Sequence, residues 1–154
     1  MNVALRPASL ADSEYCFQLH KAAMGDYIRS IWGWDEQAQH DYHDRGFVPE
    51  RWQIITVDHA DVGAISVEYH ASHIYLARIE IQPDHQGHGI GSQLVGDLLD
   101  QAATSNRSVV LDVFSINHRA QSFYHRLGFT PDGPREPSNI KVRMTATPNH
   151  IHRS

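Results

Sequence analysis

The sequence predicts an α/β fold in which a single domain is built on a mixed sheet with helices on both faces. The first observation is the order of the expected elements: strand, helices, three strands, helix, strand, helix and a strand pair. The second is that 154 residues with 41% hydrophobic side chains suit one domain with one sizeable core. No repeat, low-complexity tract or linker divides the sequence, so we expect a domain over residues 1–146 and a frayed tail over residues 147–154.

The N-terminal third is expected to hold a short strand and two helices. Residues 3–6 read as the strand, and Ser9 followed by Asp12 is typical of a helix N-terminus. Apolar residues then recur on one helical face from Tyr15 to Trp32, which predicts a helix that ends near Gly33. A second, more polar helix is expected over residues 35–44.

The remaining elements follow from alternation, helical spacing and capping residues. Residues 52–57, 62–69 and 73–81 read as three strands. A glycine-rich loop comes next, and helical spacing of apolar residues from Leu94 to Ala102 predicts the helix after it. Residues 108–114 form a further strand, Asn117 caps a helix that runs to Leu127, and Gly128 ends it. Two closing strands are expected within residues 129–146, around a bend rich in proline and glycine at residues 131–137.

Charge and composition exclude several classes of protein. The formal charge is -5, only two of the thirteen basic residues are lysine, and no basic stripe is present, which argues against a nucleic-acid partner. The single cysteine, Cys16, excludes an internal disulfide and is consistent with a reducing cytoplasm; its place on an apolar stripe favours a packed thiol. The N-terminus lacks signal-peptide features and no stretch is long enough for a membrane span, so we expect a soluble, cytoplasmic protein without a membrane partner.

The loop within residues 79–92 is the strongest functional signal. Gly87, Gly89 and Gly91 let the backbone approach a ligand closely, and the helix that follows offers unpaired N–H groups and partial positive charge. This arrangement favours a phosphate or pyrophosphate. A Walker loop is excluded because no lysine follows the glycines, and the spacing also differs from the dinucleotide-binding fingerprint. A flexible turn between a strand and a helix is the structural alternative.

Two blocks of the sequence carry a family resemblance. The segment Gln86-Gly87-His88-Gly89-Ile90-Gly91 resembles the Gln/Arg-x-x-Gly-x-Gly/Ala signature of the GNAT superfamily of acyl-CoA-dependent N-acyltransferases, and Ile81 and Pro83 precede it as they do in that family. A later block resembles the strand, helix and Tyr-x-x-Leu-Gly-Phe segment of the same family; it comprises Leu111, Asp112, Val113, Asn117, Ala120, Tyr124, Leu127, Gly128 and Phe129.

The resemblance implies a splayed central sheet and acetyl-CoA as the co-substrate. Backbone exposed by the splay would bond the pantetheine arm from Ile79, Glu80 and Ile81, and Asn117 would contact a pantetheine amide while also capping its helix. Residues 87–92 would hold the pyrophosphate. The full set of loop residues implied to bind the coenzyme is Gln86, Gly87, His88, Gly89, Ile90, Gly91 and Ser92. Homodimers are frequent in the family, so a homodimer is possible here.

Acyl transfer from a thioester to an amine needs a proton for the departing thiolate and a base for the amine. By resemblance, Tyr124 is the acid, and it would also lie against the coenzyme; a phenol suits this role because its pKa, about 10, is near that of a thiol. The alternative is that Tyr124 only packs in the core.

Two carboxylates compete for the role of general base. Glu80 shares a strand face with Ile74, Leu76 and Arg78, and burial at the end of that apolar row would make it more basic. Asp112 interrupts another apolar run but has a shorter reach. For each carboxylate the alternative is an ion pair, for example with Arg78, or a charge at the sheet edge.

The acceptor is expected to contact the segment between the first two helices. Tyr27 and Trp34 are the candidate substrate-binding residues, since aromatic walls beside Asp35 and Glu36 suit a protonated amine. Ordinary packing is the alternative for Tyr27. The twelve histidines are scattered without the spacing of a zinc site, so we expect no metal.

These observations predict direct acetyl transfer from acetyl-CoA to a primary amine of a small molecule or peptide. Two alternatives stay open. An acyl-CoA-binding sensor or assembly module would bind acetyl-CoA without turnover, and an NAD-dependent enzyme would bind a nicotinamide cofactor instead of coenzyme A. Retention of Tyr124, Asn117 and a candidate carboxylate favours turnover.

Overall fold

A computed structural model describes residues 1–133 and 139–148. In this part of the chain seven strands form one sheet in the order β1-β2-β3-β4-β5-β7-β6. The pair β4–β5 is parallel, whereas β1–β2, β2–β3, β5–β7 and β6–β7 are antiparallel. The predicted mixed α/β fold is therefore confirmed.

The chain divides into two compact units. The first unit comprises Met1–Ser66 and Arg78–Ile90, and the second comprises Val67–Ala77 and Gly91–Ser154. Strands β3 (Ala60–Tyr69) and β4 (His73–Ile81) each contribute residues to both units. The first unit also holds β1 (Val3–Pro7), α1 (Ser13–Trp32), α2 (Glu36–Gly46) and β2 (Trp52–Val57). The second holds α3 (Ile90–Thr104) from Gly91 onward, β5 (Ser108–Phe114), α4 (His118–Arg126), β6 (Thr130–Pro131) and β7 (Lys141–Ala146).

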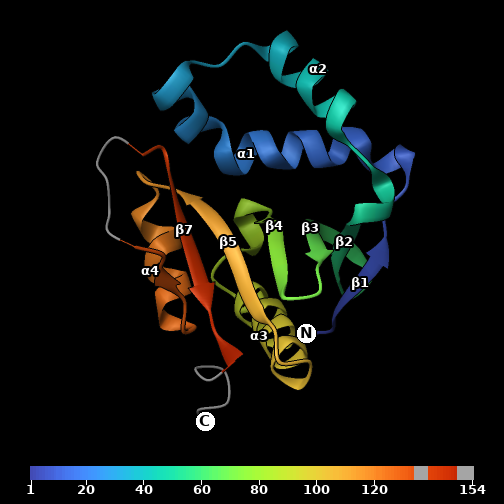
Figure 1. Cartoon of the computed structure of the whole chain (residues 1–154). Helices are drawn as coiled ribbons and strands as arrows, with labels where there is room; N and C mark the ends of the chain where they lie inside the picture. Colours follow the sequence, from blue (N-terminus) through green and yellow to red (C-terminus); the bar gives the residue numbers. More distant parts are fainter. Residues whose placement is uncertain (134–138, 149–154) are drawn as a thin grey trace. The chain divides into compact units, whose positions relative to one another are not determined.

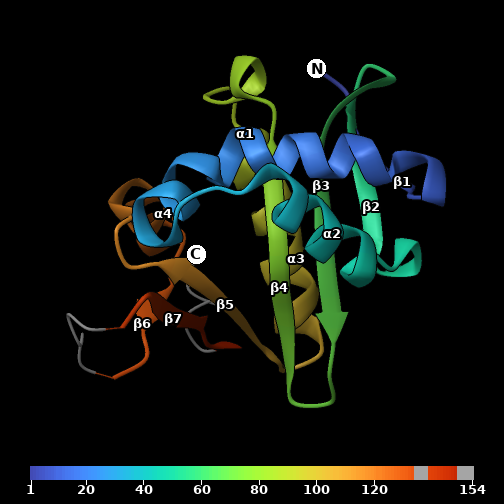
Figure 2. The same cartoon turned by 90° about the horizontal axis from the view of Figure 1, so that it is seen from above.

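Helix α1 organises the first unit. A short 3-10 turn precedes it, where Ser9 and Asp12 form the expected capping box, and Gly33 ends it with a φ of +80°. Cys16 and Leu19 of α1 pack in one buried cluster with Ile54 of β2 and Ala64 of β3. Figure 2 shows α1 running across β2 and β3. The predicted single helix up to Trp32 is therefore confirmed.

Helix α2 packs beside α1 in the same unit (Figure 1). Its N-cap, Asp35, accepts a hydrogen bond from the Ala38 amide at 2.9 Å, which explains why the helix begins at Glu36. The rings of His40 and Phe17 lie 4.4 Å apart between their centroids. The polar second helix predicted from the sequence is thus present, and it runs two residues further than expected.

In the second unit, β5 lies next to β7 (Figure 1). Val109, Leu111 and Val113 are the buried residues of β5, as the alternation predicts. Asn117 accepts a hydrogen bond from the Ala120 amide at 3.1 Å as the N-cap of α4, and Gly128 follows that helix with a φ of +102°. The two closing strands are confirmed as β6 and β7. Most of the predicted bend at residues 131–137 and of the tail at 147–154 lies outside the described residues.

None of the helices in residues 1–133 and 139–148 combines the length and the apolar character needed to span a membrane.

Candidate functional site

The glycine loop joins β4 to α3 and is exposed from Gln86 to Gly89. Gly87 and Gly89 have φ values of +79° and +82°, which a residue with a side chain rarely adopts. The Gln86 side chain donates to the Ile81 carbonyl at 2.9 Å and so ties the loop back to the end of β4. Ile90 is buried and begins α3, so Gly91 and Ser92 lie in the first helical turn. An exposed backbone that leads into a helix N-terminus fits a bound phosphate.

The candidate pantetheine-binding residues occupy the last part of β4. The ladder between β4 and β5 joins His73 to Ser108, Ile74 to Val109 and Tyr75 to Val110. Strand β4 continues past this ladder to Ile79, Glu80 and Ile81. These three residues therefore lie beyond the part of β4 that the register pairs with β5.

Glu80 is a buried carboxylate that pairs with a residue the sequence did not single out. Its Oε2 lies 2.7 Å from Nδ1 of His20 on α1, and its side chain is 3% exposed. Within the described residues its other oxygen, Oε1, is buried without a hydrogen-bond partner. Among the described residues, the hydrogen-bond partner of Glu80 is therefore His20 and not Arg78. The guanidinium of Arg78 instead lies 5.4 Å from the centroid of the Trp52 ring.

Asp112 of β5 uses both oxygens in bonds to other side chains. Arg143 donates to Oδ1 and Oδ2 at 3.1 and 3.0 Å, and the Tyr75 hydroxyl donates to Oδ2 at 2.7 Å. The hydrogen bonds from Arg143 hold the pKa of Asp112 below its usual value, while burial raises the pKa of Tyr75 to about 12. A carboxylate so stabilised in its charged form is a weak proton acceptor, so the expected alternative of an ion pair describes Asp112 better than a catalytic base does.

Replacing Asp112 with asparagine should therefore affect stability more than turnover. We expect a loss of about 1 kcal/mol in the free energy of unfolding, because the largely exposed Arg143 loses its charged partner. Since the pKa of Asp112 is lowered in the folded protein, this contribution is present above its unfolded pKa. It should disappear as the pH falls through the folded value. Urea denaturation at neutral and acidic pH measures this difference, and a large fall in kcat with unchanged stability would contradict it.

Tyr124 and Asn117 both belong to the second unit, on α4 and at its N-cap. The Tyr124 ring is half-buried and packs edge-on against Phe123 and Phe129, at 5.1 and 5.5 Å between centroids. Gln121, which the sequence did not single out, is buried on the same helix and donates to the Phe114, Ser115 and Asn117 carbonyls at 3.0–3.3 Å. Gln121 thus fixes the turn from β5 into α4.

The two candidate substrate-binding residues both lie in the first unit. Trp34 is half-buried and tilted against Phe17 at 6.3 Å, and Tyr27 is half-buried on α1. Trp34 Nε1 is buried without a hydrogen-bond partner in the described part of the chain.

Burial raises the pKa of the Cys16 thiol to about 11, which agrees with a packed cysteine and not a nucleophile.

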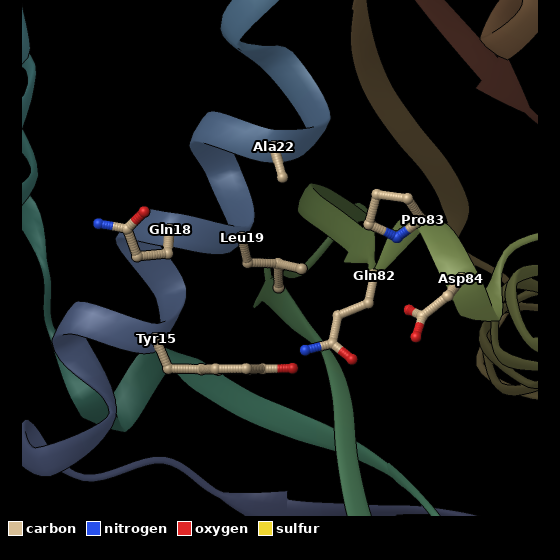
Figure 3. A pocket seen from close by; sticks show the side chains of 7 residues that line it. All are labelled: Tyr15, Gln18, Leu19, Ala22, Gln82, Pro83 and Asp84. Atoms are coloured by element: carbon tan, nitrogen blue, oxygen red, sulfur yellow. The ribbon is translucent and has the colours of Figure 1, made fainter.

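A pocket of about 380 Å³ lies in the first unit (Figure 3). Helix α1 contributes Tyr15, Gln18, Leu19 and Ala22 to its wall, and the chain after β4 contributes Gln82, Pro83 and Asp84. Tyr15 is oriented along the wall with its hydroxyl toward the Gln82 side chain in this view. Burial raises the pKa of Tyr15 to about 12, so the phenol stays protonated at neutral pH.

No group of three histidine, cysteine, aspartate or glutamate side chains suited to a metal ion is found among residues 1–133 and 139–148. Beside the loop, His85 is paired with Asp84 at 3.2 Å and His88 is exposed. His150 and His152 lie outside the described residues.

Comparison with known proteins identifies the same family that the two sequence blocks resemble. Residues 15–129 match the Acetyltransferase (GNAT) family. The matched segment covers most of the chain, including most of α1, the glycine loop and Tyr124. The protein therefore belongs to the GNAT acetyltransferase family.

Two individual relatives are similar to parts of the chain. It is 38% identical over 82 residues to N-alpha-acetyltransferase 40 of Saccharomyces cerevisiae, covering 47% of this chain and 28% of that protein. It is 30% identical over 101 residues to 5-NmdU N-acetyltransferase of Pseudomonas phage PaMx11, covering 66% and 60%. The chain thus spans less than two thirds of the length of either relative.

A solved structure supports the fold. PaiA N-acetyltransferase of Thermoplasma acidophilum, in complex with coenzyme A, superposes with a TM-score of 0.74 at 16% identity, covering 96% of this chain and 99% of that one.

Proposed function

We propose that the protein transfers an acetyl group from acetyl-CoA directly to a primary amine of a small molecule or peptide. The observation that carries this proposal is the glycine loop. Gly87 and Gly89 adopt positive φ values directly before the N-terminus of α3, inside a segment that matches an acetyltransferase family. The solved relative with coenzyme A supports the choice of acyl donor.

The residues present fit coenzyme A. In this proposal the amides of Gly87 to Ser92 bind the pyrophosphate, with Gln86 fixing the loop to β4. The main chain of Ile79, Glu80 and Ile81 bonds the pantetheine arm, and Asn117 and Tyr124 are the other residues that we expect to contact the coenzyme. Acetyl-CoA supplies an activated acyl carbon, and no metal is required for the transfer.

Each side chain then has a defined task. Tyr124 donates its phenolic proton to the departing thiolate as the carbon–sulfur bond breaks. The amine loses a proton as it forms the new carbon–nitrogen bond. This proton goes to a base at or next to Glu80. Asp112 is a poor candidate for that base because Arg143 and Tyr75 engage both of its oxygens.

The class of acceptor is inferred from the acceptors of the relatives and from the net charge of the chain. Relatives of the chain include an N-alpha-acetyltransferase and a 5-NmdU N-acetyltransferase, so proteins similar to this chain use more than one kind of acceptor. The net charge of -5 is compatible with attracting a cationic amine. Tyr27 and Trp34 are the aromatic residues that we propose contact the acceptor.

The proposal is tested by measuring thiol release from acetyl-CoA with a panel of ethanolamine, lysine, spermidine and a peptide with a free N-terminus. Calorimetry with coenzyme A is run in parallel. Binding together with amine-dependent thiol release supports the proposal. Binding without release for any amine would indicate the sensor or assembly module instead, and no binding would overturn the use of coenzyme A.

A further inference from the structure

The contact between His20 and Glu80 brings together two ionisable side chains that are 60 positions apart in the sequence. His20 lies on the face of α1 that packs toward the sheet, and Glu80 lies on β4. His20 Nδ1 and Glu80 Oε2 lie 2.7 Å apart, and with Glu80 ionised the carboxylate can only accept, so the imidazole N–H at Nδ1 is then the donor. In a neutral imidazole with its proton on Nδ1, the second ring nitrogen, Nε2, carries the free lone pair.

The two side chains differ in their access to a substrate. The Glu80 side chain is 3% exposed, whereas that of His20 is 18% exposed. A carboxylate at this depth is poorly placed to meet an incoming amine directly, but the imidazole above it is accessible. Glu80 Oε1 is buried and makes no hydrogen bond within the described residues, so its charge is not compensated by another donor there. Such a carboxylate stabilises a positive charge on its imidazole partner.

The other titratable and charged groups near the pair do not replace Glu80 in this role. On α1, burial raises the pKa of Cys16 to about 11, so this thiol is neutral. On α2, burial lowers the pKa of His43, so this imidazole is neutral at neutral pH. On β4, Arg78 is a cation held over Trp52. Glu80 is therefore the group in this set that can act as the counterion of a protonated His20.

We propose that His20 is the general base of the acetyl transfer and that Glu80 positions it. As the amine nitrogen bonds to the acyl carbon and the carbon–sulfur bond breaks, the Nε2 lone pair of His20 takes the amine proton. Glu80 keeps the Nδ1–H bond and remains ionised, while Tyr124 protonates the thiolate. The inference rests on the proposed function, because it assigns a base for that same reaction.

The test uses His20→Asn, measured with acetyl-CoA and the best amine of the panel. The asparagine amide can still donate to Glu80 from a position near Nδ1, so the link between α1 and β4 is kept while Nε2 is lost. We expect kcat to fall about 10²-fold, with KM for acetyl-CoA within about twofold of wild type. The fall of kcat/KM toward acidic pH should also be lost.

Two further variants separate catalysis from structure. His43→Asn removes a half-buried histidine that bonds the Ser13 carbonyl at 3.0 Å; it should lower the melting temperature without changing kcat. Glu80→Gln keeps an acceptor for Nδ1–H but removes the charge, so kcat should fall while KM for acetyl-CoA stays within about twofold of wild type. A His20→Asn variant with wild-type kcat and pH profile would overturn the inference alone. A wild-type protein without turnover on any amine would overturn the proposed function as well.

Discussion

Replacing Tyr124 with phenylalanine is expected to lower kcat by about 10²-fold while leaving the affinity for acetyl-CoA within about twofold of wild type. The ring contacts with Phe123 and Phe129 do not involve the hydroxyl, so the variant should keep its packing and its fold. The substitution removes the phenolic proton that, in the proposed mechanism, goes to the leaving thiolate. Steady-state kinetics gives kcat, and calorimetry with coenzyme A gives the affinity.

The matched control is Tyr42→Phe on α2, where the tyrosine is 71% exposed and belongs to no candidate site. This variant should keep the wild-type kcat. If Tyr124→Phe also kept it, Tyr124 would be a packing residue and the thiolate would have to take its proton from elsewhere. A loss of coenzyme binding equal to the loss of kcat would instead place the hydroxyl in binding.

Local signals in the sequence were sufficient to predict most of the fold. Asn117 and Gly128 mark the two ends of α4 through capping and a positive φ, and both effects act within a few residues of the chain. The bounds of β2, β4 and β5 follow in the same way from alternation and from the turns between them. The glycine loop was predictable because three glycines at alternate positions are a signal that the sequence shows by spacing alone.

The partners of the two candidate carboxylates, Glu80 and Asp112, were not predictable in this way. His20 meets Glu80 across 60 residues, and Arg143 meets Asp112 across 31. Such pairs depend on which strands and helices become neighbours. The spacing of apolar residues in α1 and in β4 does not contain this information. A signal was available for His20, since it is a polar residue next to Leu19 on the face of α1 that otherwise reads as apolar.

Gly63 shows a different limit, because it reads only as a small residue within an alternating strand. In the structure β3 and β4 approach closely at this point, and the Val62 carbonyl accepts from the Gln82 amide at 2.8 Å. A Cβ added at Gly63 would meet the Glu80 carbonyl oxygen, and it would also lie 3.2 Å from the Ile81 Cα. Backbone atoms cannot rotate away as a side chain can. The absence of a side chain at residue 63 therefore lets β4 take the path that holds Glu80 under His20.

Replacing Gly63 with alanine should accordingly destabilise the protein by about 3 kcal/mol, because overpacking against backbone forces the strands apart. Turnover should fall as well, since any movement of Glu80 disturbs its bond to His20. The control is Gly96→Ala in α3, where the added Cβ has no neighbour within 4 Å and alanine favours the helix by about 0.5–1 kcal/mol. Urea denaturation followed by circular dichroism measures both variants. A Gly63→Ala protein as stable as wild type would show that β3 and β4 can separate at this point without cost.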